Sequence, residues 1–430
     1  MKAGFYEANI TPPLGGYIWG SYAPHFGKDV DDELFAKALV VEDKGEIAAF
    51  VCIDSCSIPA DMHDIVTKRI FDYTGITADR VCLSSNHTHK GATILDAAEL
   101  DLFADETFKD VCYRKTADAV ILAYKRLQEV TVTFDTVQVP GLAHNRTSVM
   151  PDGTYRTWIS NETIEVSKLS GEDNTYSIMT FKAEGTPIGS LSSFPLHQDT
   201  TAHEGFYSGD YSSAISANLK EKYGPNFVSL FLLGTCGDIN HIDHKLENRP
   251  DDYTLYHRVI GKKLADSAIP FIENSKNYVG EGVSVVKELV TFKKRVPDME
   301  TILNELSTID IRCGLCRKNY TYYLGTNLTD EVDLYIQCIT IGDVCINILP
   351  GEVFVDIGLE IKEKSPFEKC FVVENSNSYC GYVPMKSVYV GNNNLLYESA
   401  LANHSCLAPE ASDVMIEKSI ELANNLKARK

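Results

Sequence analysis

The sequence predicts an α/β fold in which mixed β-sheets and flanking helices form one large layered domain. Short apolar runs alternate along the chain with segments whose apolar residues recur at helical spacing, as is typical of layered α/β folds. No internal repeat, low-complexity tract or Pro/Ser-rich linker separates these segments. We therefore expect residues 1–430 to form a single domain, with a possible insertion at about 294–330 between two strand-like regions.

The first half of the chain has clear local signals. Residues 47–54 form a short apolar run suited to a buried strand. A helix is expected over 59–73, because apolar residues share one face and Gly75 follows as a stop. The face consists of Met62, Ile65, Val66 and Ile70. The next expected elements are a strand at 80–85, a helix at 105–128, a strand at 130–139, and paired strands at 176–182 and 187–194.

The second half continues the alternation of helices and strands. A helix at 208–223 precedes an apolar strand at 227–233. Residues 334–349 are expected to form a hairpin around Gly342-Asp343. Helices at 353–364 and 408–430 complete the pattern.

Composition excludes some classes of partner. Lys and Arg number 40 against 60 Asp and Glu, so the formal net charge is −20. Nucleic-acid binding needs clustered Lys and Arg, and so does docking on an anionic membrane surface. No apolar stretch approaches the ~20 residues of a membrane span. We expect a small-molecule substrate, no nucleic-acid partner and no stable membrane anchor; the oligomeric state stays open.

The cysteines and the N-terminal residues bear on the cellular compartment. No apolar leader is visible at the start, and many of the 12 cysteines lie in apolar, strand-like runs. This favours a cytoplasmic protein with reduced, buried thiols. Cys313 and Cys316 form a lone Cys-x-x-Cys without a second ligand pair, and a redox or metal role for them stays open.

The first candidate functional cluster lies at the end of the strand expected over 80–85. His87 and His89 would face the same side of an extended backbone, because side chains repeat every two residues. Two histidines at the carboxyl end of a strand suit a metal or acid/base site. The alternative is a pair of partly exposed loop histidines.

Two further polar residues follow apolar runs elsewhere. His197 follows the strand expected over 187–194, and by itself it fits a hydrogen-bonded structural histidine better than a metal ligand. Glu352 follows a Pro350-Gly351 turn and precedes a helix, so it points either into a site or toward the positive end of the helix dipole. A later segment, 379–384, is rich in tyrosine and glycine.

A second acidic and histidine-rich cluster competes with these residues. Asp238, His241, Asp243 and His244 follow the strand expected over 227–233. They could form a pocket wall or a rival metal site. Asp54 ends a buried strand, where it could orient a ligand histidine from behind.

The order of these motifs resembles the neutral/alkaline ceramidase family. The resemblance begins in the opening stretch 3–13 and continues at 32–39. The family's His-Thr-His-Ser-Gly motif stands here as His87-Thr88-His89-Lys90-Gly91. Further matches are Asn145-Arg146-Thr147, Ser208-Gly209-Asp210, Pro350-Gly351-Glu352, Tyr382-Val383 and Tyr397-Glu398-Ser399.

The resemblance implies a single zinc site around which the layered domain is built. By position, the ligands would be His87, His197, Glu352 and Tyr382. Their imidazole, carboxylate and phenolate groups suit zinc. Zinc-bound hydroxide would then attack the carbonyl carbon of an amide in an N-acyl substrate. Arg146 and Tyr397 resemble residues that bind the amide, and His89 is placed to move a proton.

Departures from the family pattern bear on the substrate. Asn240 and His241 replace a serine and a proline, so no serine hydroxyl is present there as a nucleophile. Asp210 and Asp238 belong to matched or adjacent motifs and are expected near the pocket. The resemblance therefore favours an amide hydrolase acting on a smaller or more polar compound than ceramide. A metal-dependent lyase or isomerase on a sugar-like metabolite, and a non-catalytic binding protein, are the alternatives.

Overall fold

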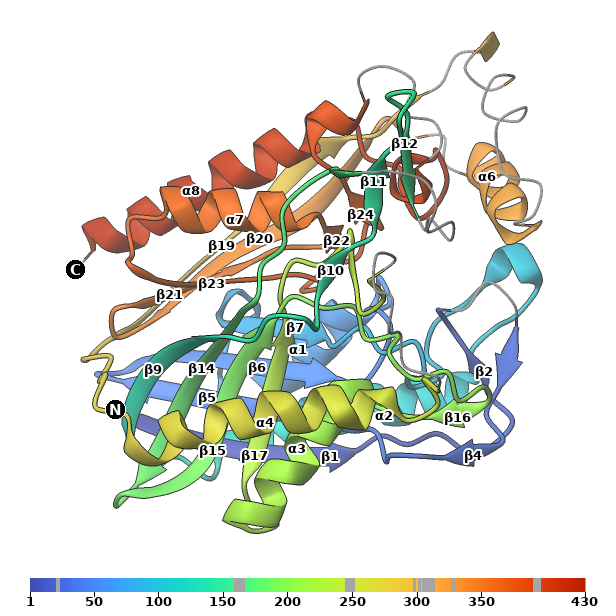
Figure 1. The fold of residues 1–430 in the computed structure, drawn as a ribbon. Coiled ribbons are helices and arrows are strands. Elements are labelled where there is room, and N and C mark those ends of the chain that lie inside the picture. The colour runs from blue at the N-terminus through green and yellow to red at the C-terminus, as the bar shows by residue number, and fades with distance from the viewer. Residues whose placement is uncertain are drawn as a thin grey trace.

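Three β-sheets form the middle of the molecule, and helices cover their outer faces (Figure 1). The computed structural model describes residues 1–20, 24–157, 167–243, 252–296, 299–300, 303, 314–326, 329–389 and 396–429. Seven α-helices lie in this part of the chain. They are α1 (Met62–Thr74), α2 (Glu106–Tyr124), α3 (Asp210–Tyr223), α4 (Tyr256–Asn274), α6 (Gly314–Thr326), α7 (Val355–Lys364) and α8 (Ala411–Ala428).

The first sheet has the order β7-β6-β5-β1-β8, with β6 and β7 parallel and the other pairs antiparallel. Its strands are β7 (Val81–Ser85), β6 (Glu46–Ile53), β5 (Phe35–Asp43), β1 (Lys2–Asn9) and β8 (Gln128–Glu129). Leu39 and Val41 of β5 face the other two sheets, whereas Ala38 and Val40 face α1 and α2. Because both faces are buried, this strand reads as a continuous apolar run.

The second sheet has the order β17-β15-β14-β9, and the third has the order β19-β20-β21-β23. The second sheet contains β17 (Val228–Leu233), β15 (Thr186–Phe194), β14 (Thr175–Ala183) and β9 (Thr131–Gln138). The third contains β19 (Val283–Lys293), β20 (Glu331–Ile341), β21 (Val344–Ile348) and β23 (Lys369–Val373). In each sheet one outer pair is parallel, β15 with β17 and β21 with β23. All three sheets are therefore mixed, as the sequence predicted.

These elements pack in four layers: α1 with α2, the first sheet, the second and third sheets together, and the outer helices α3, α4, α7 and α8. One apolar cluster lies between the first sheet and the other two. A second lies under α3 and α4, and a third under α7 and α8. A bridge between Gly234 and Val373 joins the ends of β17 and β23, so the second and third sheets meet at these strands.

Short strand pairs line the loops between the layers. They are β2 (Tyr17–Ile18) with β3 (His25–Phe26), β4 (Asp29–Val30) with β16 (Phe206–Tyr207), β10 (His144–Asn145) with β18 (Ile239–Asn240), and β22 (Glu352–Val353) with β24 (Tyr382–Val383). A small sheet contains β11 (Thr147–Val149), β12 (Tyr155–Thr157) and β13 (Ser167–Lys168).

Most expected elements are confirmed, and their ends have local causes. The Asp105 carboxylate accepts hydrogen bonds from the backbone N–H groups of Thr107 and Phe108, which starts α2. This helix ends at Tyr124, earlier than expected, because Gln128 instead pairs with Ala3 in the first sheet. The strands β14 and β15 join through a two-residue turn with positive φ at both positions, a geometry that suits a tight hairpin.

The prediction that Ile65 belongs to the buried face of α1 was wrong. Met62, Val66 and Ile70 are buried, but Ile65 is 50% exposed. The buried residues recur at every fourth position, and this narrow stripe leaves Ile65 on the side facing solvent.

The predicted insertion lies between two neighbouring strands. Lys293 of β19 pairs directly with Glu331 of β20, so the chain leaves and re-enters the third sheet at adjacent positions. Within 294–330 the structure places α6, while Cys313 and the side chain of Cys316 lie outside the described residues. The ten cysteines whose side chains are described are free thiols, mostly buried. No helix in the described part of the chain is both long and apolar enough to cross a membrane.

The two isoleucines of α1 provide a matched test of this packing. Ile70→Ala removes a fully buried side chain and should lower the free energy of unfolding by about 2–5 kcal/mol. Ile65→Ala makes the same change at a half-exposed position and should cost under about 1 kcal/mol. Chemical denaturation of both variants measures the difference. Equal losses would contradict the orientation of the helix.

Candidate metal centre

Three polar side chains converge from the ends of strands in three different sheets. His87 follows β7 of the first sheet, His197 follows β15 of the second, and Glu352 lies just after β21 of the third. Each of these strands has a parallel neighbour. The site therefore lies where the carboxyl ends of strands meet, the usual position of ligand sites in α/β proteins.

The three ligand atoms lie close together and are buried. His87 Nε2 is 3.2 Å from His197 Nε2 and 3.3 Å from Glu352 Oε2. His197 Nε2 is 3.4 Å from the same oxygen. The three side chains are at most 3% exposed. We call His87, His197 and Glu352 the ligand triad.

Backbone carbonyls determine which nitrogen each histidine presents. His87 Nδ1 is 2.6 Å from the Cys56 carbonyl oxygen, and His197 Nδ1 is 2.8 Å from that of Cys236. A carbonyl oxygen only accepts hydrogen bonds, so each Nδ1 carries the proton. Both Nε2 atoms therefore face the centre of the triad, and each presents a lone pair there when its ring is neutral.

The carboxylate of Glu352 is oriented by a tyrosine that the sequence reasoning did not assign. Tyr379 donates a hydrogen bond of 2.7 Å to Glu352 Oε1. The other oxygen, Oε2, is buried and accepts no hydrogen bond from any described residue. Burial alone would raise the pKa of Glu352, but the charge of neighbouring His87 holds it well below its usual range. A carboxylate oxygen without a hydrogen bond thus lies beside the Nε2 atoms of both histidines.

This arrangement fits a divalent metal ion. A tetrahedral ion with bonds of about 2.0–2.1 Å separates its ligands by about 3.3–3.4 Å, which is close to the spacing within the triad. Two imidazoles and a carboxylate also form a donor set that zinc accepts. Without a metal ion or a proton between them, three mutually facing acceptors would be left buried at a high electrostatic cost.

A turn at Gly351 delivers Glu352 to the triad. Gly351 has φ of 72°, and a Cβ at this position would lie 2.4 Å from the carbonyl oxygen of Gly381. Only glycine satisfies both conditions. β22 then pairs in parallel with β24, which places Tyr382 opposite Glu352.

His89 lies beside the triad, although not by the geometry expected from an extended strand. Its Nε2 is 3.3 Å from His87 Nε2, but His87 has φ of 67°, so a left-handed turn brings the two rings together. Burial and the charge of His87 lower the pKa of His89 to about 3, so this imidazole is neutral at neutral pH. Cys56, His87 and His89 form a second possible ligand group. Burial raises the pKa of the Cys56 thiol, which makes the triad the better site.

Arg146 belongs to a buried network next to the triad. Its Nε donates to Glu398 Oε1 at 2.7 Å, and its Nη2 donates to the Gly237 carbonyl at 2.9 Å and to the Tyr382 hydroxyl at 3.1 Å. The Tyr382 ring packs against Tyr397, with centroids 5.6 Å apart. Burial raises the pKa of Tyr382 well above its usual value, and Arg146 opposes this rise. The structure thus brings together Arg146, Tyr382 and Tyr397.

Asp54 hydrogen-bonds to Asn86, the neighbour of His87, and not to a ligand histidine as the sequence suggested. Its carboxylate accepts hydrogen bonds from the Phe35 backbone at 2.7 Å and the Asn86 side chain at 2.7 Å, and from no histidine in the described part of the chain. The ligand histidines are held instead by the Cys56 and Cys236 carbonyls. Asp54 therefore supports the loop that carries His87 through its neighbour Asn86.

Two other predicted aspartates also hold loops. Asp210 accepts hydrogen bonds from the backbone and hydroxyl of Thr200, three residues after His197. Asp238 accepts from Asn145, Ser170 and the first residue of α7, and its own carbonyl accepts from the backbone of Arg146. Burial raises the pKa of Asp238 to about 6.

Asn240 and His241 meet Asp199 at one wall of the site. The Asn240 amide donates to both oxygens of Asp199, at 3.1 and 3.0 Å, and His241 Nδ1 lies 3.4 Å from one of them. Burial would raise the pKa of Asp199, but His241 holds it well below its usual range. Among described residues, the possible metal groups do not include Asp238, His241 or Asp243, and His244 lies outside the described part.

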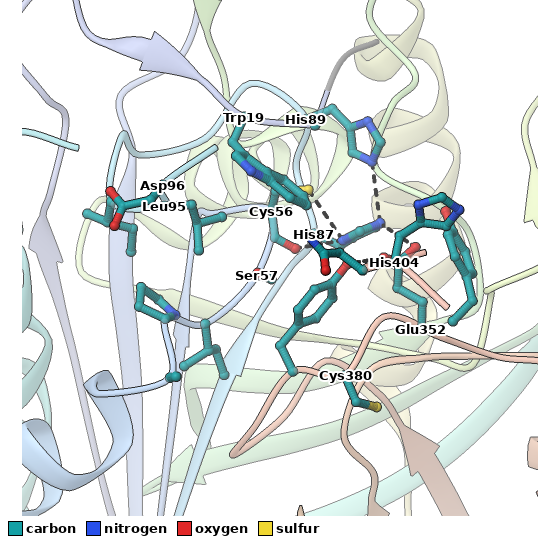
Figure 2. Close-up of a pocket in the computed structure, with 18 of the residues that line it drawn as sticks. Trp19, Cys56, Ser57, His87, His89, Leu95, Asp96, Glu352, Cys380 and His404 are labelled. Carbon is teal, nitrogen blue, oxygen red and sulfur yellow. Dashed lines mark hydrogen bonds and ion pairs between the residues drawn. The ribbon is translucent and has the colours of Figure 1, made fainter. Parts of the chain in front are cut away.

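A cavity of about 980 Å³ opens onto the triad. His89, Arg146, Tyr382 and Tyr397 line it together with the triad residues His87 and Glu352. Figure 2 shows Leu95 and Asp96 across the cavity from His87 and Glu352. The wall mixes apolar and charged groups. It includes Trp19, Ile58, Ile94 and Leu95, and also Asp61, Asp96, Glu99 and Lys109.

Sequence reasoning did not assign a role to two groups of the site, Tyr379 and Glu398. Glu398 lies within the Tyr397-Glu398-Ser399 motif and Tyr379 lies three residues before Tyr382, but neither has a spacing that predicts its contact. Glu398 is fully buried and also accepts a hydrogen bond from the Thr157 hydroxyl.

Comparisons with known proteins agree with this architecture. Residues 3–241 match the family described as neutral/alkaline non-lysosomal ceramidase, N-terminal. The crystal structure of neutral ceramidase from Pseudomonas aeruginosa is 18% identical, with a TM-score of 0.78 over all of this chain and 74% of that chain. A ceramidase solved in complex with C2 is 17% identical, with a TM-score of 0.76 over all of this chain and 75% of that chain. A search of curated proteins finds no match.

Tyr379→Phe tests the support of the triad. Loss of the hydroxyl frees Glu352 Oε1, and the affinity for zinc should fall about 10- to 100-fold. Competition with a chromogenic chelator measures this affinity. Tyr113→Phe is the matched control, because it removes a 2.8 Å bond from a tyrosine to Asp61 outside the triad. An unchanged affinity in Tyr379→Phe, or an equal fall in the control, would contradict this role.

Proposed function

Because the chain belongs to the neutral/alkaline ceramidase family, we propose that it is a zinc-dependent hydrolase that cleaves the amide bond of an N-acyl compound. The observation that carries the proposal is the triad, in which two imidazole Nε2 atoms and a carboxylate oxygen without a hydrogen bond meet at ligand spacing. A site of this kind beside a large cavity supports catalysis on a bound small molecule.

His87, His197 and Glu352 would hold the zinc, and we propose Tyr382 as a fourth ligand. Tyr382 supports this assignment by pairing opposite Glu352 in the strands β22 and β24. Zinc would supply Lewis acidity, which polarises a carbonyl and makes water more acidic.

The cavity residues around the triad would bind the amide and move protons. Arg146 carries a permanent positive charge, and Glu398 and the Gly237 carbonyl hold its guanidinium in place. A fixed charge of this kind stabilises negative charge developing on the carbonyl oxygen. Tyr397 would complete the wall against the amide. Neutral His89 has a nitrogen able to accept a proton from water and pass it to the leaving amine.

The cavity wall supports a substrate that is smaller or more polar than ceramide. Asp61, Asp96, Glu99 and Lys109 line the cavity together with apolar residues. Burying a long alkyl chain against charged groups costs free energy, because these groups lose water without gaining a partner. A compound with an apolar segment and a polar end matches the mixture of groups.

Zinc content and solvent labelling test the proposed reaction. The purified chain should hold about one zinc, and His87→Ala should lose it. With an N-acyl substrate in H₂¹⁸O, mass spectrometry should find one solvent oxygen in the released carboxylate, because hydrolysis adds water to the acyl carbon. Polar N-acyl compounds should turn over faster than long-chain ceramide.

Three outcomes would contradict the proposal. Product formation without solvent oxygen would indicate a lyase or isomerase. Zinc content that His87→Ala leaves unchanged would separate the metal from the triad. Ceramide turnover as fast as that of any polar N-acyl compound would overturn the substrate class.

Arg146→Met tests the stabilising charge. It should lower kcat about 100- to 1000-fold, as removal of an oxyanion-stabilising donor does, while zinc content stays constant. Steady-state kinetics and metal analysis measure the two quantities. Arg69→Met is the control, since Arg69 pairs with Asp118 near the surface and should leave kcat unchanged. A loss of zinc in Arg146→Met would assign this residue to the support of the metal site instead.

A further inference from the structure

Lys90 is an unusual feature of the cavity wall. It directly follows His89 and lines the same cavity, yet its side chain is only 6% exposed. It stands where the motif that resembles the ceramidase family has a serine. An ammonium group that has lost most of its contact with water costs free energy unless a partner offsets that loss.

The Lys90 ammonium has no such partner within the described part of the chain. Its backbone N–H donates to the Thr88 hydroxyl and its carbonyl accepts from Ser208, but its Nζ makes no hydrogen bond or ion pair to a described residue. The matched case is Lys109, which lines the same cavity and pairs with Asp61 and Glu106 at 3.7 Å.

Most of the acidic groups around Lys90 are engaged elsewhere. Four carboxylates influence it through their charge. Three of them accept hydrogen bonds or ion pairs elsewhere, Asp31 from His203, Asp199 from Asn240 and Asp210 from Thr200, whereas Glu204 is 72% exposed and lies 3.9 Å from His25. None of them lies within ion-pair distance of Nζ, so three N–H donors are left for a ligand. Burial lowers the pKa of Lys90, and a bound anion would oppose this effect.

We propose that Lys90 binds a carboxylate on the substrate, and therefore that the substrate is an N-acyl compound carrying a carboxylate, such as an N-acyl amino acid. The N-acyl part of this inference rests on the proposed amide hydrolysis. The carboxylate part rests only on the charge of Lys90 in the cavity. A monoanion is favoured over a phosphate, because the four nearby carboxylates repel a dianion more strongly.

Binding of non-hydrolysable probes tests this inference separately from turnover. N-octanesulfonylglycine carries the carboxylate, N-octanesulfonylglycinamide is its neutral counterpart, and the sulfonamide resists hydrolysis. Calorimetry on the zinc-loaded protein should show about 10- to 100-fold tighter binding of the carboxylate, the usual effect of a charge-assisted hydrogen bond. Lys90→Met and Lys90→Ser should lose this preference and keep the affinity for the neutral probe, and Lys90→Arg should retain part of it.

Lys109→Met is the matched control and should keep the preference, because Lys109 is already paired. Equal binding of the two probes by the unaltered protein, or binding of neither, would overturn the proposal. An equal loss of both probes in Lys90→Met and Lys90→Ser would assign Lys90 a structural role and overturn it too. Tighter binding of the aminomethylphosphonate analogue would overturn the choice of a carboxylate. Preference for the carboxylate without any amide turnover would support the role of Lys90 while the proposed function fails.

Discussion

The convergence of His87, His197 and Glu352 is the constraint on which the rest of the structure depends. Three acceptor atoms face one another within 3.4 Å in a buried place, an arrangement that is costly without a cation between them. The fold must hold them there before any ion binds. Each of the three residues therefore has a separate support: a backbone carbonyl for each histidine, and Tyr379 for the carboxylate.

A second set of buried polar groups surrounds this centre and joins distant segments. Asp238 connects the loop that carries Arg146 to the start of α7, and Glu398 connects Arg146 to Thr157. These carboxylates are buried and accept several hydrogen bonds each, which keeps them from being left unsatisfied. Rigid support of this kind preorganises charge at the site, and preorganised charge is what stabilises a transition state.

Sequence patterns predicted the elements of the fold well and their contacts less well. The buried runs of β6 and β17 and the hairpin of β14 with β15 follow from local periodicity and turn residues. The outward orientation of Ile65 and the early end of α2 depend on what each helix packs against. Asp54 was expected to hold a histidine, but the backbone carbonyls of Cys56 and Cys236 do so. Every residue has a backbone carbonyl, so the sequence cannot indicate which one accepts a hydrogen bond from a histidine.

The sequence by itself determined the types and order of the site residues: a histidine pair, a later histidine, a glutamate after a Pro-Gly turn, and an arginine in a motif. Only the tertiary structure decided which of them meet, because His87 and His197 are 110 residues apart and lie on different sheets. It also left the Lys90 ammonium without a hydrogen bond or ion pair to any described residue, while Lys109 is paired. The burial and the pairing of a charged side chain depend on neighbours distant in sequence. The folded arrangement of the layers therefore decides which charged side chain is left to face a ligand.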